Sequence, residues 1–165
     1  MRTRFRLGLL VVAVVAAVFV AGYAVAGSIT PASFVTSGTT RYAMVSMGPT
    51  ETTTTTSTAF VDIAGMSTTI RVPSGKTAEL IITFSAMVNT CSAMYVRAVV
   101  DGSAASPSYT QFQWNFSGGA DSHAFTFYKT VKAGSHTVAM QWEGLTSCSQ
   151  QFMASRSMIV TANIH

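Results

Sequence analysis

The sequence has few of the side chains that carry chemistry. Of its 165 residues, 10% are charged, six are acidic, three are histidines and two are cysteines. Acid–base and metal catalysis need several such groups close together, so their scarcity counts against an active site. No Cys-x-x-Cys pair and no Asp-x-Asp-x-Asp-Gly loop is present to hold a metal. We therefore expect a protein that is not an enzyme and carries no cofactor and no metal.

Two weaker metal arrangements stay open. His123 and His136 begin successive predicted strands and could share a metal with Asp121 or Glu143, but histidines exposed at strand ends explain them better. A calcium ion could also bind in a loop at Asp101 or Asp121. The setting of Asp101, in "VVDGS", favours a turn residue of a β-hairpin instead.

The basic charge is concentrated at the N-terminus. Three of the ten Lys and Arg residues are Arg2, Arg4 and Arg6, and the other seven nearly balance the six acidic residues. These seven form no run along the sequence: Arg41, Arg71, Lys76, Arg97, Lys129, Lys132 and Arg156. Proteins that bind nucleic acid need a basic patch or stripe, so we expect no nucleic-acid partner.

The first 26 residues have the organisation of a secretory signal peptide. Three arginines precede an apolar run from Leu7 to Val20, and the small residues of "AVA" at 24–26 form a cleavage site. We expect cleavage after Ala26 and a secreted, extracellular protein. An uncleaved segment would instead anchor the protein in a membrane, because a span needs about 20 apolar residues.

The two cysteines, Cys91 and Cys148, both lie in the exported part of the chain. In an oxidising compartment an even number of cysteines predicts a disulfide. Both lie between predicted strands, so this bridge would join two loops at one end of the domain. Closing a loop of this length stabilises the fold by about 4 kcal/mol in the chain-entropy model. Two buried free thiols are the alternative.

The rest of the chain predicts an all-β fold. Short runs rich in Thr, Val, Phe and Met alternate with turns that contain glycine, and no segment has helical periodicity. Apolar residues recur at every second position in "AELIITF" and "HTVAMQW". The strands predicted in this way cover residues 41–47, 57–63, 67–72, 78–88, 93–100, 109–116, 123–131, 135–142 and 155–164.

Strands of this number and spacing predict a single two-sheet antiparallel β-sandwich, either jelly-roll-like or immunoglobulin-like. The domain covers residues 41–165, after the signal peptide (1–26) and a flexible leader (27–40). The threonine run 52–56 is too short and too poor in proline for a mucin-like stalk. Threonine favours extended backbone, so this run is expected to lead into a sandwich strand at an exposed edge.

The segments "TAFVDIAGMSTTIRVPSGKTAELIITFSAMV", "YVRAVVDG", "FTFYKTVKAGSHTVAMQW" and "RSMIVTANIH" resemble a type of small secreted bacterial β-sandwich. That type is similar to the jelly rolls of tumour necrosis factor and of the complement globular heads. The resemblance spans residues 57–165 and rests on the rhythm of strands and turns. It implies a jelly roll, a recognition role and trimers as one oligomeric state, and it implies no catalytic residues.

The candidate binding site lies in "SYTQFQWNF" at 108–116. Alternation places Phe112, Trp114 and Phe116 on one face, where they are expected to join the core. The opposite face carries one aromatic ring and three amides: Tyr109, Gln111, Gln113 and Asn115. Amides and aromatic rings suit sugar hydroxyls, through hydrogen bonds and stacking. An ordinary solvated sheet face is the alternative.

Three classes of function remain. The first is a secreted or cell-surface, non-catalytic binding module that recognises a carbohydrate, an envelope component or a protein partner. The second is a structural jelly-roll domain that forms homo-oligomers. The third is a glycan-active hydrolase or lyase that uses two of the six carboxylates. The scarcity of acidic residues and histidines favours the first class over the third.

Overall fold

The computed structural model describes residues 32–35, 40–90, 92–112, 120–144 and 151–165. This part of the chain contains no helix that could span a membrane. Its nine strands are β1 (Ala32–Val35), β2 (Thr40–Met47), β3 (Thr53–Thr55), β4 (Val61–Asn89), β5 (Met94–Val100), β6 (Ser103–Ala104), β7 (Thr110–Phe112), β8 (Asp121–Gly144) and β9 (Gln151–Ile164). The prediction of an all-β fold is confirmed.

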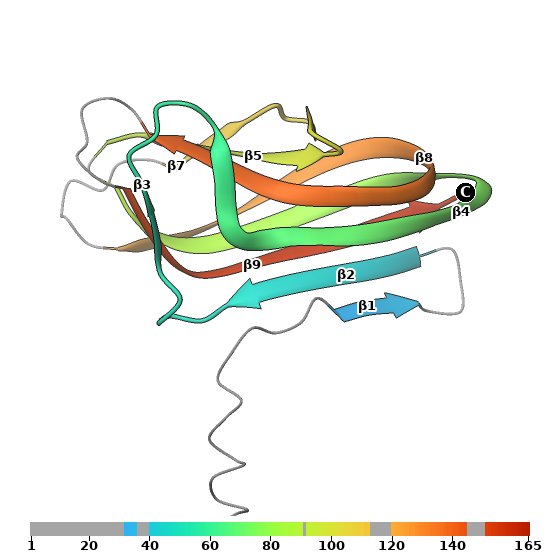
Figure 1. Ribbon diagram of the computed structural model, residues 1–165, viewed down its shortest axis with the longest axis horizontal. Helices are drawn as coiled ribbons and strands as arrows, with labels where there is room; N and C mark the ends of the chain where they lie inside the picture. Colours follow the sequence, from blue (N-terminus) through green and yellow to red (C-terminus); the bar gives the residue numbers. More distant parts are fainter. Residues whose placement is uncertain (1–31, 36–39, 91, 113–119, 145–150) are drawn as a thin grey trace, which may run out of the picture.

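Two long strands, β4 and β8, determine the architecture. Each of them turns back at the same end of the molecule (Figure 1). Residues 61–72 of β4 pair with the second half of β8, and residues 77–88 pair with its first half. The two turns, at 73–76 and 133–134, contain Gly75 and Gly134, whose φ angles of 72° and 149° are ones that other residues rarely adopt. We call this end of the molecule the turn end.

Because β4 and β8 turn back, the strands form two layers. One layer contains β2, β9, the second half of β4 and the first half of β8, in that order, with β1 added beside β2. The other contains the first half of β4, the second half of β8, then β5, with β6 and β7 on its far side. A double ribbon folded over itself in this order is a jelly roll, so the predicted jelly-roll-like sandwich is confirmed.

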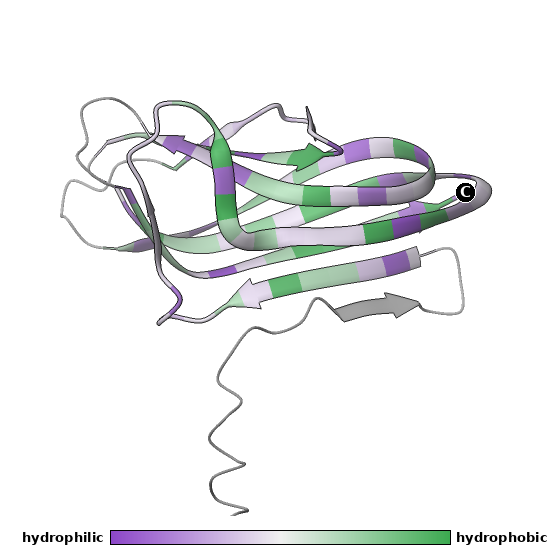
Figure 2. Cartoon of the chain, in the orientation of Figure 1, coloured by the Kyte–Doolittle hydropathy of each residue, from purple (hydrophilic) through white to green (hydrophobic). Residues whose placement is uncertain are grey.

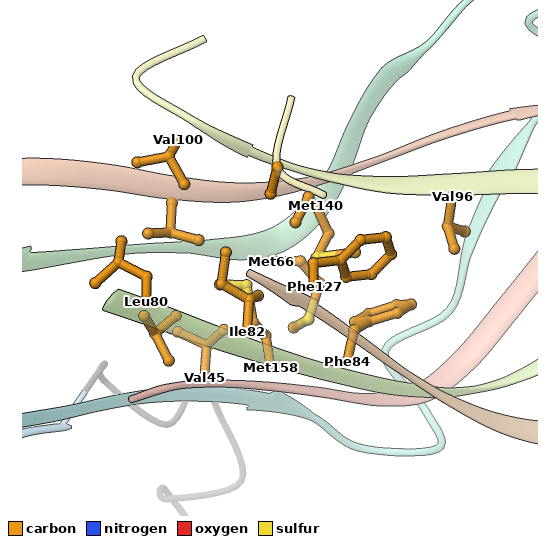
Figure 3. Packing of buried hydrophobic residues seen from close by; sticks show 14 of the residues in the cluster. Val45, Met66, Leu80, Ile82, Phe84, Val96, Val100, Phe127, Met140 and Met158 are labelled. Carbon is orange, nitrogen blue, oxygen red and sulfur yellow. The ribbon is translucent and has the colours of Figure 1, made fainter. Parts of the chain in front are cut away.

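The core lies between the two layers. Buried residues alternate with more exposed ones along each strand, as the sequence predicts for Leu80, Ile82 and Phe84, which are fully buried. Figure 3 shows side chains from both layers, among them Phe127 and Met140, packed against one another. Figure 2 shows the corresponding alternation of hydrophobic and hydrophilic bands along the strands. Trp142 is the largest fully buried side chain in the described part of the chain.

Among the residues that the structure describes, one buried side chain is charged. Arg156 is 3% exposed and donates hydrogen bonds to the carbonyl oxygens of Ala64 and Glu51. Arg156 points inward because it alternates in step with the buried Met158 and Val160. A β-bulge directly precedes it, where Ser155 has a φ of 28° and the β4–β9 register shifts. Burial lowers the pKa of Arg156, and the carbonyl oxygens compensate for the water that the guanidinium loses. Arg156 therefore ties the chain near Glu51 to the irregular part of β4.

Some element boundaries differ from the predictions. Residues 61–63 of the segment predicted at 57–63 and the segments predicted at 67–72 and 78–88 form one strand, β4, because its hydrogen bonds to β8 resume beyond each bulge and turn. Residues 57–60 precede this strand and are not part of it. Similarly, 123–131 and 135–142 both belong to β8. Residues 32–35, placed in the flexible leader, pair with β2, since their aromatic and β-branched residues favour a strand.

The threonine run is part of the fold. Thr53–Thr55 forms the short strand β3 on the edge of β9, where Thr55 is 8% exposed. The run was expected to lead into the strand at 57–63, and it instead forms a strand of its own. The signal peptide and both cysteines lie outside the described residues, so cleavage and the Cys91–Cys148 bridge stay predictions. The register places Asn89 opposite Phe152, which brings the chain segments that lead to the two cysteines side by side.

Candidate functional site

Polar and aromatic side chains lie together on the outer face of the layer formed by β7, β5, β8 and β4. Their neighbours in sequence, such as Met94, Val96 and Met140, are fully buried, so alternation directs these residues outward. We call this group the aromatic–amide strip. It consists of Phe60, Asp62, Tyr95, Arg97, Tyr109, Gln111, Gln141 and Glu143.

Strand register brings the members of the strip into two rows. Gln111 lies opposite Tyr95, and Tyr95 lies opposite Glu143. In the next row Arg97 lies opposite Gln141, which lies opposite Asp62. Neighbouring strands lie about 4.8 Å apart, so the strip extends across about 14 Å from β7 to β4.

The aromatic end of the strip is formed by two tyrosines. The rings of Tyr95 and Tyr109 meet edge to face, with centroids 5.4 Å apart and an angle of 84° between the planes. Tyr109 is 56% exposed, which is high for so large an apolar side chain. Tyr95 holds the Tyr109 ring in place and leaves much of it open to solvent, as a stacking platform requires.

The polar end of the strip is held by a chain of contacts. Arg97 donates from Nε to Oε1 of Gln141 at 2.8 Å, and Gln141 donates from Nε2 to Oδ1 of Asp62 at 2.8 Å. The Arg97 guanidinium also lies over the ring of Phe60, 4.0 Å from its centroid. These contacts fix the orientation of the planar groups and leave further N–H groups and lone pairs for a ligand.

Sequence reasoning identified part of this strip. Tyr109 and Gln111 lie in it as predicted, and Phe112 is fully buried beside them, also as predicted. Gln113 and Asn115 lie outside the described residues. The remaining members of the strip were missed, because only strand register brings them next to Gln111. The available signal was the alternation in "MYVRAVV" at 94–100, which places Tyr95 and Arg97 on the outer face.

A second polar group lies near the turn end, where Asp101 meets His136. The Asp101–Gly102 turn has φ angles of 50° and 76°, which confirms the predicted hairpin turn. Oδ2 of Asp101 lies 2.7 Å from Nδ1 of His136, and Oδ1 accepts from the Thr137 N–H at 2.9 Å. Nε2 of His136 lies 2.8 Å from the carbonyl oxygen of Lys132. The expectation of an exposed strand-end histidine is therefore wrong for His136, whose side chain is 13% exposed.

These contacts shift both pKa values. The hydrogen bond from His136 lowers the pKa of Asp101 below its ordinary value of 3.8 and, with the Thr137 N–H, outweighs the opposing effect of burial. Burial lowers the pKa of His136, but hydrogen bonds to Asp101 and to the Lys132 carbonyl outweigh it and raise the pKa above 6.5. Both Asp101 oxygens are already engaged, which leaves little for a calcium ion.

The structure separates His136 from His123. His123 lies opposite Ala86, whereas His136 lies opposite Ile70 near the turn end, so the two face different halves of β4. The His123 ring stacks on Phe125 with an interplanar angle of 7°. The His123 side chain is nevertheless 31% exposed, and its Nε2 lies 3.1 Å from Oδ2 of Asp121 at the start of β8, so the expectation of an exposed strand-end histidine holds in part. His123 cannot share a metal with His136, which pairs with the other half of β4. In the described part of the chain, no three His, Cys, Asp or Glu residues form a group suited to a metal.

No family model matches the chain, and no curated protein matches its sequence. Among solved structures, the chain is similar to dimeric latent PorU from Porphyromonas gingivalis, with a TM-score of 0.49 and 9% identity over 84% of this chain and 14% of that one. It is also similar to a chain of infectious bursal disease virus, Gx strain, with a TM-score of 0.44 and 14% identity over 82% of this chain and 36% of that one. The chain spans well under half the length of both.

A third solved structure, a CBM4, has a TM-score of 0.25 and 15% identity over 87% of this chain and 82% of that one. Because these three structures are at most 15% identical to the chain, the function is argued below from the side chains of this protein.

Proposed function

We propose that this protein is a secreted or cell-surface, non-catalytic module that binds carbohydrate through the aromatic–amide strip. The observation that carries the proposal is the combination of an exposed, held tyrosine ring with oriented amide, guanidinium and carboxylate groups on one sheet face. Sugar rings present an apolar face for stacking and hydroxyl groups that both donate and accept hydrogen bonds. The strip offers partners for each of these features.

The strip is organised before a ligand arrives. The Arg97–Gln141–Asp62 contacts and the Tyr95–Tyr109 contact restrict side chains that would otherwise lose conformational freedom on binding. Ordering a flexible side chain costs about 0.5–1.5 kcal/mol, so a held strip binds more tightly than a mobile one. Its open shape also suits a polymer, which can extend beyond the strip on either side.

The test is a glycan array probed with the secreted protein, followed by titration calorimetry with the glycans that bind. Tyr109→Ala and Gln111→Ala are each expected to weaken binding about five- to tenfold, as the loss of one stacking or hydrogen-bonding group predicts. Tyr128→Ala is the matched control, because Tyr128 is 54% exposed on the other layer. The proposal would be refuted if no glycan on the array bound the protein, or if all three variants bound with the same affinity as the wild type.

A second candidate function, an oligomer-forming structural domain, is favoured by a different surface. On the outer face of the other layer, Tyr42, Thr161, Ile81 and Tyr128 lie in one cross-strand row that carries no charge. Tyr42, Ile159 and Tyr128 on this face are 38–54% exposed. Light scattering should then give a defined oligomer that Ile159→Lys converts to monomers. A wild-type monomer at high concentration would exclude this role.

A further inference from the structure

A hollow opens at the turn end, between the two turns. Its volume is about 420 Å³, and it is lined by Arg71, Val72, Ser74, Ala133, Gly134 and Ser135. Arg71 lies opposite Ser135 in the β4–β8 ladder, so both long strands contribute to the walls. Sites for small ligands have volumes of about 300–1,000 Å³, and this hollow falls within that range.

Basic residues that are far apart in the sequence lie at the turn end, and Arg71 among them lines the hollow. Lys132 lies opposite Thr77, next to Lys76 in the β4 turn. Arg41, on β2, donates from Nη1 to the carbonyl oxygen of Arg71 at 2.7 Å. Figure 2 shows hydrophilic bands on β2, β4 and β8 close to this end. The fold thus builds a basic patch that no run of charge in the sequence predicts.

Three of these cations have no partner. In the described part of the chain, the side chains of Arg71, Lys76 and Lys132 are exposed and form no hydrogen bond or ion pair. The acidic side chains at this end are Glu79 and Asp101. His136 already engages Asp101, which leaves Glu79 as the acidic side chain free to offset three unpaired cations.

We propose that this hollow binds the phosphate group of a phosphorylated saccharide. A guanidinium binds phosphate oxygens through two parallel hydrogen bonds, and lysines add positive charge. The hydroxyls of Ser74 and Ser135 can donate to the remaining oxygens. At about 30 Å³ per water molecule, the hollow has room for about fourteen waters, more than a bare phosphate fills. Its lining contains no aromatic ring, which favours a hydroxylated ligand over a nucleotide base.

The test is titration calorimetry of the full secreted protein with glucose 1-phosphate, inorganic phosphate and glucose. We expect glucose 1-phosphate to bind more tightly than inorganic phosphate, and glucose not to bind in the hollow. Arg71→Gln should weaken binding of the sugar phosphate at least about tenfold, the effect of removing a charged hydrogen-bond donor. Lys129→Gln is the control, because it removes the same charge from a lysine whose Nζ already donates to the carbonyl oxygens of Ser103 and Ala104.

The proposal does not depend on carbohydrate binding by the aromatic–amide strip. Gln111→Ala should leave phosphate binding unchanged, and Arg71→Gln should leave neutral-glycan binding unchanged, so either site can fail alone. No binding of the sugar phosphate by the wild type would overturn the proposal. Equal losses in Arg71→Gln and Lys129→Gln would overturn it as well, since they would indicate diffuse charge attraction. Binding to vesicles of anionic lipid without binding to the soluble sugar phosphate would also overturn it.

Discussion

Replacing His136 should remove much of the change in the free energy of unfolding that the wild type shows as the pH rises above neutral. The His136 ring lies between two acceptors, the Asp101 carboxylate and the Lys132 carbonyl oxygen. A neutral imidazole carries one N–H and can satisfy one of them, whereas the imidazolium donates to both. Protonation of His136 therefore strengthens the link between the Asp101 turn and the β8 turn.

The exposure of the two side chains sets how much the His136–Asp101 contact stabilises the fold. A hydrogen bond to a charged group contributes about 1.5–3 kcal/mol when it is buried. The His136 side chain is 13% exposed, but that of Asp101 is 50% exposed, so water screens the pair. We expect the contact to stabilise the fold by about 1 kcal/mol, or about 4 °C in melting temperature for a domain of this size.

The pKa shifts of His136 and Asp101 determine in which direction the free energy of unfolding changes with pH. The raised pKa of His136 means that its contribution is complete below 6.5 and is lost as the pH rises through the higher folded value. The lowered pKa of Asp101 means that its contribution is present above 3.8 and is lost as the pH falls through the lower folded value. The difference in stability between wild type and His136→Ala should therefore be largest in the window between these limits.

The assay is urea unfolding of the wild type and His136→Ala at a series of pH values from mildly acidic to alkaline. The difference in free energy of unfolding should shrink as the pH rises above neutrality. His165→Ala is the control, because it removes an exposed histidine whose neighbour in the sheet is Thr77. A difference that stays constant across the whole range would refute the role of His136 protonation.

Two further predictions concern the stability of the domain. Arg156→Ala should destabilise the fold by about 3 kcal/mol, since it removes a buried side chain and leaves the carbonyl oxygens of Ala64 and Glu51 without their donor. Chemical denaturation measures this loss, and a loss no larger than that of a typical surface mutation would contradict the prediction. Reduction of the predicted Cys91–Cys148 bridge should increase the mass by that of two hydrogen atoms and lower the free energy of unfolding by about 4 kcal/mol. An unchanged mass on reduction would show free thiols instead.

The class of fold could be predicted from the sequence because the side chains of each layer alternate. In β5, the pattern that places Arg97 outside also places Val96 and Ala98 inside, and the structure shows this arrangement. The unbroken length of β4 and β8 could not be predicted, because glycine turns such as 73–76 are typical of the ends of separate strands. Here hydrogen bonding to the partner strand resumes beyond the turn.

In the two proposed sites, local sequence patterns identify only the residues that are close together in the chain. Tyr109 and Gln111 are close in the sequence, so alternation alone was sufficient to identify them. Gln141 and Asp62 are 79 positions apart, and they meet only through the pairing of β8 with β4. The same holds for Arg71 and Lys132, which form no charge run in the chain but lie at one end of the folded domain.

The turning of β4 and β8 from one layer into the other also affects how the domain can come apart. Because both long strands belong to both layers, the layers are joined covalently through two turns, and each layer contains one half of the β4–β8 ladder. Partial unfolding of a single layer is therefore disfavoured, and the amide protons of both halves should exchange with solvent in a single cooperative opening. Proteases would then find few partly open states to cleave.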